Sequence, residues 1–303
     1  MDQRCVAAAK LEEIVPIIDR KAAKSAIPPV ALSADPVEPC PGSVFDWNEG
    51  TAMFGLDDKH VVISGAGGGI GRSLVAAFQA AGARVTACDR DAALLEPLEG
   101  VAKYVFELTD PEATERAVAD IVAGEGTPDV LVSNAGFSRA ETMEQVNRQS
   151  WDQEVDINLT GSFNLIDPTM KAMIANGGGA IVMTSTVNAL SHYGNPAYAA
   201  AKAGLVAYMR AIAVENGRHN IRANCICPGS VRTPAWDHRV EKDPGLLTKV
   251  VAHYPLGRLT MPADVANAAV FLASPLAGAI TGVALPVDAG LTAGNLRFIR
   301  DVF

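Results

Sequence analysis

Short runs of β-branched residues alternate with helix-length segments along most of the chain. Seven such runs follow one another from His60 onward: HVVIS, RVTAC, VAKYVFE, DVLVS, AIVMT, IRANCI and GVALPV. Strands separated by crossovers of this length pair in parallel, and a parallel sheet needs helices on both faces. The alternation therefore predicts an α/β fold with a doubly wound sheet of seven parallel strands. Ligands of such sheets bind at the carboxyl ends of the strands, so we expect functional residues directly after them.

The composition is that of a protein with a large apolar core. Nearly half of the 303 residues are apolar, and the formal net charge is -9. A negative protein has no field that attracts nucleic acid or an anionic membrane, so we expect neither partner and favour a small-molecule ligand. The uncharged run 265–287 is long enough for a membrane span, but Pro275, Gly282 and Pro286 interrupt it. It predicts a buried helix, a turn and a strand instead.

The five cysteines match no disulfide or zinc framework. Cys225 and Cys227 are two residues apart, which places both on one face of a strand. Because no further ligands follow at a recognisable spacing, we interpret them as buried structural thiols and expect no metal. Free thiols and the lack of a signal-peptide pattern favour a reducing, cytoplasmic location.

Residues 1–52 differ in composition from the rest of the chain. Six prolines are scattered through them, and their one helical pattern is short, near Val6 to Ile18. Such a segment buries too little apolar surface to hold a fold. We expect a flexible extension or a start assigned too early, followed by one domain over 53–303 that carries the motifs. An arm that packs on a partner subunit is the alternative.

A glycine-rich loop, SGAGGGIG, follows the first expected strand and opens a helix. Gly65, Gly69 and Gly71 let the backbone approach a pyrophosphate, and the helix amino terminus supplies N–H donors. The loop favours a Rossmann-like, dinucleotide-binding fold over a plain tight turn. Asp89 ends the second strand 18 residues beyond Gly71, where an acid binds the adenosine ribose and repels a 2'-phosphate. We therefore predict NAD as the cofactor, and Arg90 is the feature that leaves NADP open.

Tyr198 precedes Lys202 by about one turn in the helix expected after the fifth strand. A phenol is a poor base at neutral pH, but a nearby ammonium lowers its pKa. The pair therefore predicts a general acid/base. Chance also supplies such pairs, so the place of this one in the fold decides its interpretation. Asn158, in a helix expected to begin near Ser150, has no role that its position alone predicts.

With these motifs in order, the chain resembles the short-chain dehydrogenase/reductase family from residue 53 to about residue 290. The matching features are SGAGGGIG, Asp89, SNAG at 133–136, Asn158, the hydroxyl cluster after the fifth strand, YAAAK at 198–202, CPGSVRTP at 227–234 and ITGVALPVDAG at 280–290. Each motif alone is weak, whereas their order and spacing together are specific. The resemblance implies an NAD(P)-dependent enzyme that acts on a CH–OH group.

The resemblance also implies roles for single residues. Tyr198 would exchange a proton with the substrate, Lys202 would bind the nicotinamide ribose and lower the pKa of Tyr198, and Asn158 would hold a water of a proton relay. The cofactor contacts it implies are Gly65, Gly69, Ile70, Gly71, Asp89, Glu107, Leu108, Asn134, Ala135, Gly136, Tyr198, Lys202, Pro228, Gly229, Val231 and Thr233.

The catalytic hydroxyl has two candidates. Counting back 13 residues from Tyr198, a common family spacing, gives Ser185, whereas counting 7 forward from Gly179 at the start of the strand gives Thr186. A one-residue shift in a strand turns the side chain to the other face, but a loop shorter by one residue costs little. We therefore favour Thr186, with Ser185 as the alternative. Glu107 is a further departure, because the family commonly has Asp there.

The substrate pocket is expected after SNAG, after the fifth strand and after CPGSVRTP. Those positions hold Phe137, Ser138, Asn188, His192, Tyr193 and Trp236. The polar segment 234–254, with a helical stretch near Leu246 to Ala252, predicts a lid. Aromatic and hydrogen-bonding side chains together indicate a small hydroxylated metabolite such as a sugar or polyol.

The sequence thus predicts an NAD-dependent oxidoreductase that interconverts a secondary alcohol and a ketone. A 3-oxoacyl-[acyl-carrier-protein] reductase is the alternative; it would favour NADPH and need a basic surface, so Asp89 and the acidic balance count against it. A dinucleotide-binding protein without catalysis is less favoured, because Tyr198, Lys202 and Asn158 are all present. The family's usual assembly implies a homotetramer formed through the helices near 150–175 and 195–217.

Overall fold

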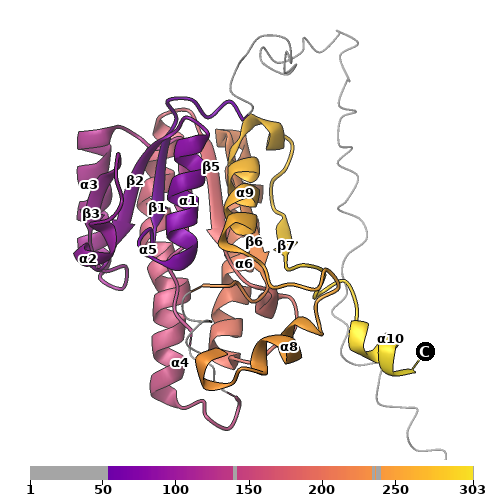
Figure 1. Ribbon diagram of the computed structural model, residues 1–303. Helices are drawn as coiled ribbons and strands as arrows, with labels where there is room; N and C mark the ends of the chain where they lie inside the picture. The colour runs from indigo at the N-terminus through magenta and orange to yellow at the C-terminus, as the bar shows by residue number, and fades with distance from the viewer. Residues whose placement is uncertain (1–53, 139–141, 234–235, 237–239, 303) are drawn as a thin grey trace, which may run out of the picture. The chain divides into compact units, whose positions relative to one another are not determined.

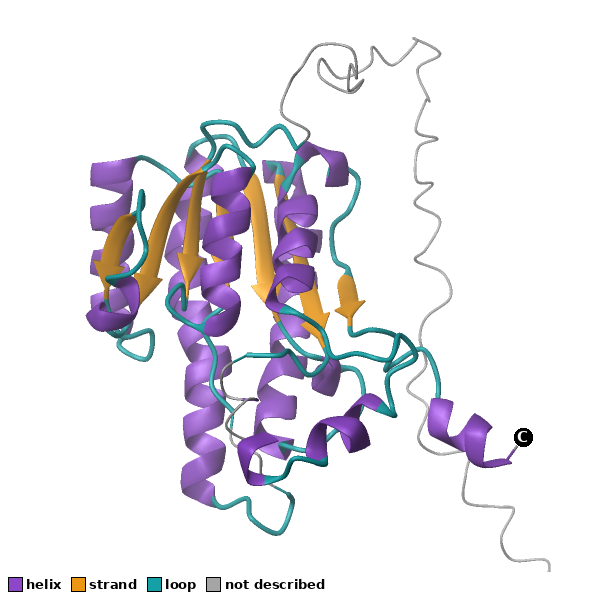
Figure 2. Cartoon of the chain, in the orientation of Figure 1, coloured by secondary structure: helices purple, strands orange, loops and turns teal. Residues whose placement is uncertain are grey.

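The computed structural model describes residues 54–138, 142–233, 236 and 240–302. Within them, a sheet of seven parallel strands carries helices on both faces, as Figures 1 and 2 show from the same side. The strand order is β3-β2-β1-β4-β5-β6-β7, so the direction of winding reverses between β1 and β4. The doubly wound α/β fold expected from the sequence is confirmed, and the reversal places a ligand crevice at the carboxyl ends of β1 and β4.

All seven expected strands are present. They are β1 His60–Ser64, β2 Arg84–Asp89, β3 Ala102–Val105, β4 Val130–Ser133, β5 Gly179–Thr184, β6 Ile221–Pro228 and β7 Ala284–Val287. Val61 and Ile63 of β1 pack in the core on one face of the sheet, while Val62 packs in the core on the other. Burial on both faces explains why the inner strands read as continuous apolar runs.

The helices form a layer on each face. They are α1 Gly69–Ala80, α2 Ala92–Leu95, α3 Pro111–Glu125, α4 Arg148–Val155, α5 Gly161–Ala175, α6 Pro196–Asn216, α8 Leu246–Val251, α9 Pro262–Ala273 and α10 Leu296–Val302. On the near face in Figure 1, α1 packs against α9, and α3, α5 and α6 cover the other face. The uncharged run 265–287 forms α9, a 3₁₀ turn and β7, as expected.

Side-chain contacts define where several helices begin and end. Asn147 and Ser150 form a capping box at the start of α4, each side chain accepting a backbone N–H of the other residue. At the carboxyl end of α9, the Arg222 guanidinium of β6 donates to the carbonyl oxygens of Leu272 at 2.7 Å and Ala273 at 2.9 Å. A cation at this end of a helix meets the negative pole of its dipole. Arg222 therefore ties α9 to the sheet.

One described helix, Pro196–His219, is long and apolar enough by length and composition to cross a membrane. It consists of α6 and the 3₁₀ turn that follows. Leu205 and Met209 on its inner face are completely buried, and the helix packs against β6. In this fold it is a core helix of the α/β sandwich.

The cysteines that the structure describes are buried thiols. Cys88, Cys225 and Cys227 are free, and Cys225 and Cys227 pack in one core cluster on the same face of β6, as predicted. Within the described ranges, no cluster of three or more His, Cys, Asp or Glu side chains is placed to hold a metal ion. The expected extension over 1–52 lies outside the described residues, and so do residues 234–235 and 237–239 of the expected lid. The helix expected near Leu246 is present as α8.

His60 is a buried histidine at the amino end of β1. Its side chain is 1% exposed, and its Nε2 lies 2.8 Å from the Thr86 hydroxyl. Burial, with a smaller contribution from Arg84, lowers the pKa of His60 below its ordinary value of 6.5. The unfolded chain therefore binds a proton at this side chain more readily than the folded chain does. The free energy of unfolding must fall as the pH drops below about 6.5 toward the folded-state pKa.

We expect the Tm, measured by calorimetry from about pH 8 to about pH 5, to fall through this window and the His60→Gln variant to lose part of that dependence. His219→Gln is the matched control, because His219 is exposed in the turn after α6. An unchanged pH slope in His60→Gln would contradict the assignment.

Candidate active site

Close backbone packing shapes the glycine-rich loop after β1. Gly65 has a φ of +63°, in the left-handed region that favours glycine. A Cβ on Gly71 would lie 2.0 Å from the carbonyl oxygen of Gly65, so the first turn of α1 can cross the loop only as glycine. The helix begins at Gly69, and its first N–H groups have no partner within the helix. This is the geometry that binds a phosphate group.

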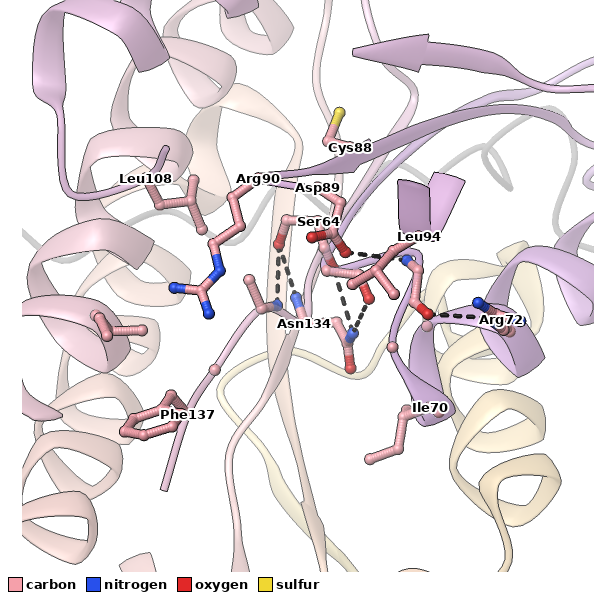
Figure 3. Close-up of a pocket in the computed structure, with 18 of the residues that line it drawn as sticks. Ser64, Ile70, Arg72, Cys88, Asp89, Arg90, Leu94, Leu108, Asn134 and Phe137 are labelled. Carbon is pink, nitrogen blue, oxygen red and sulfur yellow. Dashed lines mark hydrogen bonds between the residues drawn. The ribbon is translucent and has the colours of Figure 1, made fainter. Parts of the chain in front are cut away.

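Asn134 ties the loop to the two neighbouring strands. The Ser64 hydroxyl oxygen accepts the backbone N–H groups of Asn134 at 3.0 Å and Ala135 at 3.1 Å. The Asn134 side-chain amide donates to the carbonyl oxygens of Ser64 and Gly65, both at 3.2 Å, as Figure 3 shows. The Thr184 hydroxyl in turn donates to Asn134 Oδ1 at 3.1 Å. These bonds join the carboxyl ends of β1, β4 and β5 into one unit.

Asp89 is fixed at the rim of the loop. Its Oδ2 accepts the backbone N–H of Gly67 at 3.1 Å, and its Oδ1 accepts that of Asp91 at 3.3 Å. The neighbouring Arg90 guanidinium lies 3.9 Å from a carboxylate oxygen of Glu107, and both side chains are about half exposed or more. The carboxylate of Asp89 is therefore held in place, and the charge of Arg90 is partly balanced.

A cavity of about 700 Å³ opens where these elements meet (Figure 3). Residues expected to bind the cofactor line it: Gly65, Gly69, Ile70, Gly71, Asp89, Glu107, Leu108, Asn134, Ala135, Gly136 and Thr233. Phe137, an expected substrate contact, lines it as well. The volume lies within the usual range of ligand sites.

Several lining residues were not predicted. Arg72, Leu94, Phe106 and Ile157 all face the cavity. Ile157 could have been found as the neighbour of Asn158, whereas Leu94 and Phe106 are single apolar residues outside any motif. The Arg72 side chain donates to the carbonyl oxygen of Gly67 at 2.9 Å, so it braces the loop.

Lys202 is buried at the carboxyl end of β5. The residue is 2% exposed, and its Nζ donates to the carbonyl oxygen of Thr184 at 2.9 Å. Burial lowers the pKa of Lys202 to about 8. The Nζ lies 5.9 Å from the centre of the Tyr198 ring. The structure therefore brings together the two side chains that the sequence paired.

The pKa of Tyr198 differs from the sequence expectation. Burial raises it to about 12, a hydrogen bond with the Thr186 side chain lowers it, and the negative charge of Glu154 raises it further. The expected lowering by Lys202 is wrong for this state, because the loss of hydration disfavours the phenolate and Nζ is directed at the Thr184 carbonyl. Burial therefore favours the neutral form of the Tyr198 phenol.

The two candidate hydroxyls have different surroundings. The Ser185 hydroxyl donates to the backbone carbonyl of Lys202 in α6 at 3.1 Å and forms a hydrogen bond with the Cys227 thiol of β6. The Thr186 side chain bonds Tyr198 and accepts the N–H of Asn188 at 3.3 Å. Consecutive residues at the end of a strand point to opposite sides. Thr186 therefore lies with Tyr198, and Ser185 anchors the helix that carries it.

Asn158 lies in a π-helical turn, Asp156–Thr160, between α4 and α5. Such turns occur often at functional sites. Its Oδ1 accepts the N–H of Phe137 at 3.1 Å, and its Nδ2 donates to the carbonyl oxygens of Phe137 at 2.7 Å and Glu154 at 2.8 Å. A Cβ on Gly136 would lie 2.9 Å from Asn158 Oδ1 and 3.2 Å from Lys202 Nζ. These three residues converge behind the cavity.

The expected nicotinamide segment follows β6. Pro228 ends the strand, Gly229 donates its N–H to the carbonyl oxygen of Val287 at 3.2 Å, and Val231 pairs with Thr260 in an isolated parallel bridge. Thr233 alone of this segment lines the cavity.

Apart from Phe137, the structure does not place the expected substrate residues around the cavity. The Asn188 side chain donates to the carbonyl oxygen of Gly194 at 3.0 Å, within its own loop. His192 and Tyr193 are exposed, as is Ser138, and Trp236 is half buried. None of them lines the cavity. Their contact with substrate stays a prediction.

Comparison with known proteins places this geometry in a large group of enzymes. The family model described as Enoyl-(Acyl carrier protein) reductase matches residues 65–292. An uncharacterised oxidoreductase of Schizosaccharomyces pombe is 37% identical over 252 residues, which cover 82% of this chain and 96% of that protein. The crystal structure of an oxidoreductase of the short chain dehydrogenase/reductase family from Burkholderia thailandensis has 43% identity and a TM-score of 0.76, covering 81% of this chain and 97% of its own.

Relatives of named activity are named for different substrates. The 3-oxoacyl-[acyl-carrier-protein] reductase of Thermotoga maritima is 35% identical over 78% of this chain and 98% of its own length. The D-threitol dehydrogenase of Mycolicibacterium smegmatis is 36% identical over 79% of this chain and 95% of its own length. These proteins have one fold in common and differ in the molecule that their names give as substrate.

The close approach at Gly71 generates a stability prediction. We expect Gly71→Ala to lower the free energy of unfolding by on the order of 2 kcal/mol, because the Cβ would meet the Gly65 carbonyl. Gly68→Ala is the matched control in the same loop, since its Cβ would lie at an ordinary 3.4 Å from that oxygen. Chemical denaturation measures both, and equal stability of the two variants would contradict the packing described here.

Proposed function

The chain belongs to the short-chain dehydrogenase/reductase family, and we propose that it is an NAD-dependent oxidoreductase that interconverts a secondary alcohol and a ketone. The observation that carries the proposal is the cluster of Tyr198, Thr186 and the buried Lys202 at the end of β5, where Lys202 approaches Gly136 of the cavity wall. Relatives named D-threitol dehydrogenase and L-fucose dehydrogenase support a sugar or polyol as the substrate.

The residues at the cavity suit a dinucleotide. The glycine-rich loop, in which even a Cβ on Gly71 would not fit, brings backbone N–H groups to the place of a pyrophosphate. Asp89 would hold the adenosine ribose, and Asn134 supports the strand ends beneath it. When bound, the nicotinamide supplies the hydride acceptor and donor. Val231 and Thr233 would hold it.

Proton transfer is the work of the chain's own side chains. Tyr198, whose neutral form burial favours, would donate its proton to the carbonyl oxygen in reduction and take it back in oxidation. Thr186 bonds Tyr198 and orients the same substrate oxygen. Lys202, whose pKa is lowered to about 8, gains and loses a proton near neutral pH. The oxidation direction needs the Tyr198 phenolate, which a nearby positive charge favours. Asn158 would place the water through which the proton reaches solvent.

NAD is the favoured form of the cofactor. The Asp89 carboxylate stands where a 2'-phosphate would bind and repels it. Arg90 lies near Glu107, so its charge is not fully free for that phosphate. The alternative function, a 3-oxoacyl-[acyl-carrier-protein] reductase, has support from the relative of that name. The net charge of -9 weighs against it, because an acidic carrier would be repelled.

A homotetramer is the proposed assembly, with a reducing cytoplasm as its location. Large apolar side chains are exposed on the long helices: Trp151 of α4 is 40% exposed, Phe163 of α5 48% and Val214 of α6 83%. Such a surface is typical of subunit contacts. The buried free thiols of Cys225 and Cys227 agree with the proposed compartment.

The direct test follows NADH absorbance when the protein and NAD are mixed with a panel of sugars, polyols, hydroxy acids and 3-hydroxyacyl thioesters. We expect turnover of at least one polyol or sugar. Turnover of 3-hydroxyacyl thioesters alone would favour the carrier-protein reductase. Binding of NADH without any turnover would favour a protein that lacks catalysis.

Replacement of the hydroxyls separates their roles. We expect Tyr198→Phe to lower kcat by about 10²- to 10⁴-fold, because it removes the proton donor, and to leave the affinity for NADH unchanged. Thr186→Val should lower kcat by at least about tenfold. Ser185→Ala should retain most activity, since the Ser185 hydroxyl bonds the backbone carbonyl of Lys202 and not Tyr198. Full activity of Thr186→Val together with loss in Ser185→Ala would reverse the assignment.

Cofactor choice is tested at Asp89. Asp89→Ala should lower kcat/KM for NAD by about tenfold or more and raise it for NADP, because two charged hydrogen bonds and one repulsion disappear. Asp91→Ala is the matched control, since Asp91 is exposed and caps α2. A wild-type protein that favours NADP would refute the proposal.

Oligomeric state is measured by light scattering at micromolar concentration. We expect the mass of four 31.6 kDa chains, and a smaller species in Val214→Glu. Val105→Glu, at an exposed position on the edge strand β3, should leave the assembly intact. A monomeric wild type would contradict the proposal.

A further inference from the structure

The two ends of the predicted lid are fastened to each other. The chain leaves β6 through residues 229–233 and returns through residues 254–260. Val231 and Thr260 form a parallel bridge between these runs. The N–H of Arg232 donates to the carbonyl oxygen of Thr260 at 2.8 Å, and the N–H of Thr260 donates to that of Ser230 at 3.2 Å. The two runs on either side of the predicted lid are therefore joined to each other.

Tyr254 contributes a buried side chain to this junction. It is 3% exposed, and its hydroxyl oxygen accepts the backbone N–H of Ser230 at 2.9 Å. A Cβ on Gly229 would lie 3.2 Å from its ring, so the ring is packed against the backbone of the same run. Tyr254 is also bonded to the end of α8, since its N–H donates to the carbonyl oxygen of Val251 at 2.9 Å. One side chain thus joins the helix of the lid to residues 229–230.

The opposite side of residues 229–230 rests on β7 and the turn after it. Gly229 donates to the carbonyl of Val287, and its Cβ would meet the backbone of Asp288 at 3.2 Å. The Asp288 side chain is engaged in its own turn, accepting the N–H groups of Gly290 at 2.9 Å and Thr292 at 2.7 Å. On one side, residues 229–230 therefore contact the end of β7. On the other side, they contact Tyr254, which follows α8.

We propose that Tyr254 is a positioning residue that sets the place of the nicotinamide by fixing Ser230 to the lid. The inference rests on the proposed function, in which Gly229, Val231 and Thr233 bracket the nicotinamide. Ser230 lies between Gly229 and Val231 in the chain. A displacement of the Ser230 backbone would therefore move the nicotinamide ring relative to Tyr198. Small displacements of reacting groups are costly in rate. Tyr254 itself does not touch the reacting atoms.

The test compares two ligands in Tyr254→Phe, which keeps the ring and removes the acceptor of the Ser230 N–H. ADP-ribose has every part of the dinucleotide except the nicotinamide. We expect the Kd of NADH, from protein fluorescence titration, to rise about three- to tenfold, the contribution of one buried hydrogen bond. The Kd of ADP-ribose should stay within about twofold. For the substrate that the panel identifies, kcat should fall with the same pH profile as in wild type.

Two controls separate positioning from a general loss of stability. Tyr104→Phe removes a hydroxyl on β3 that lies near Gly124 of α3, and we expect it to change neither Kd. Thr260→Val removes a buried hydrogen bond to the Val287 carbonyl in the same region but keeps the backbone contacts between the two runs. We expect it to lower the Tm without the selective effect on NADH.

The possible outcomes are distinct. Equal weakening of NADH and ADP-ribose, or the same selective loss in Thr260→Val, would overturn the positioning role. Unchanged NADH binding and kcat in Tyr254→Phe would also overturn it. Failure of the wild-type protein to bind either ligand would instead refute the proposed function.

Discussion

The hydrogen bond from the buried Lys202 ammonium to the Thr184 carbonyl is the interaction on which the site depends. A charged group is costly to bury, so it is retained in a core only where it is well bonded. The bond fastens α6 to the end of β5, and Ser185 reinforces it by donating to the Lys202 carbonyl. With the helix and the strand fixed together, Tyr198 and Thr186 meet although they come from different elements.

The same strand end also organises the cofactor side. The Thr184 carbonyl accepts a hydrogen bond from Lys202, and the Thr184 hydroxyl donates one to Asn134. The backbone N–H of Asn134 in turn donates to Ser64 at the start of the glycine-rich loop. One chain of hydrogen bonds therefore runs from Lys202 through Thr184 and Asn134 to the glycine-rich loop. Because the strands are parallel, all of these groups emerge at one edge of the sheet. Thr184 is therefore the residue that both halves of the site share.

Much of this arrangement was predictable, because it follows from local patterns. The seven strands came from apolar runs, and the register of β5 separated Thr186 from Ser185 through the alternation of strand side chains. Other features depend on contacts between distant residues. The π-helical turn at Asn158 has no sequence signature, and Tyr254 meets Ser230 only after the chain has traversed the lid. The pKa of Tyr198 depends on how completely the fold excludes water, which the spacing to Lys202 does not encode.

The central claim is direct hydride transfer between the substrate carbon and a nicotinamide held at this edge of the sheet. The most direct measurement uses an alcohol that supports NADH formation, deuterated at its carbinol carbon, with mass spectrometry of the reduced dinucleotide. The account predicts that NADH carries the label, that heavy water adds none to it, and that Tyr198→Phe forms almost no product. Label that enters NADH from heavy water, or stays absent while the alcohol is consumed, would contradict it.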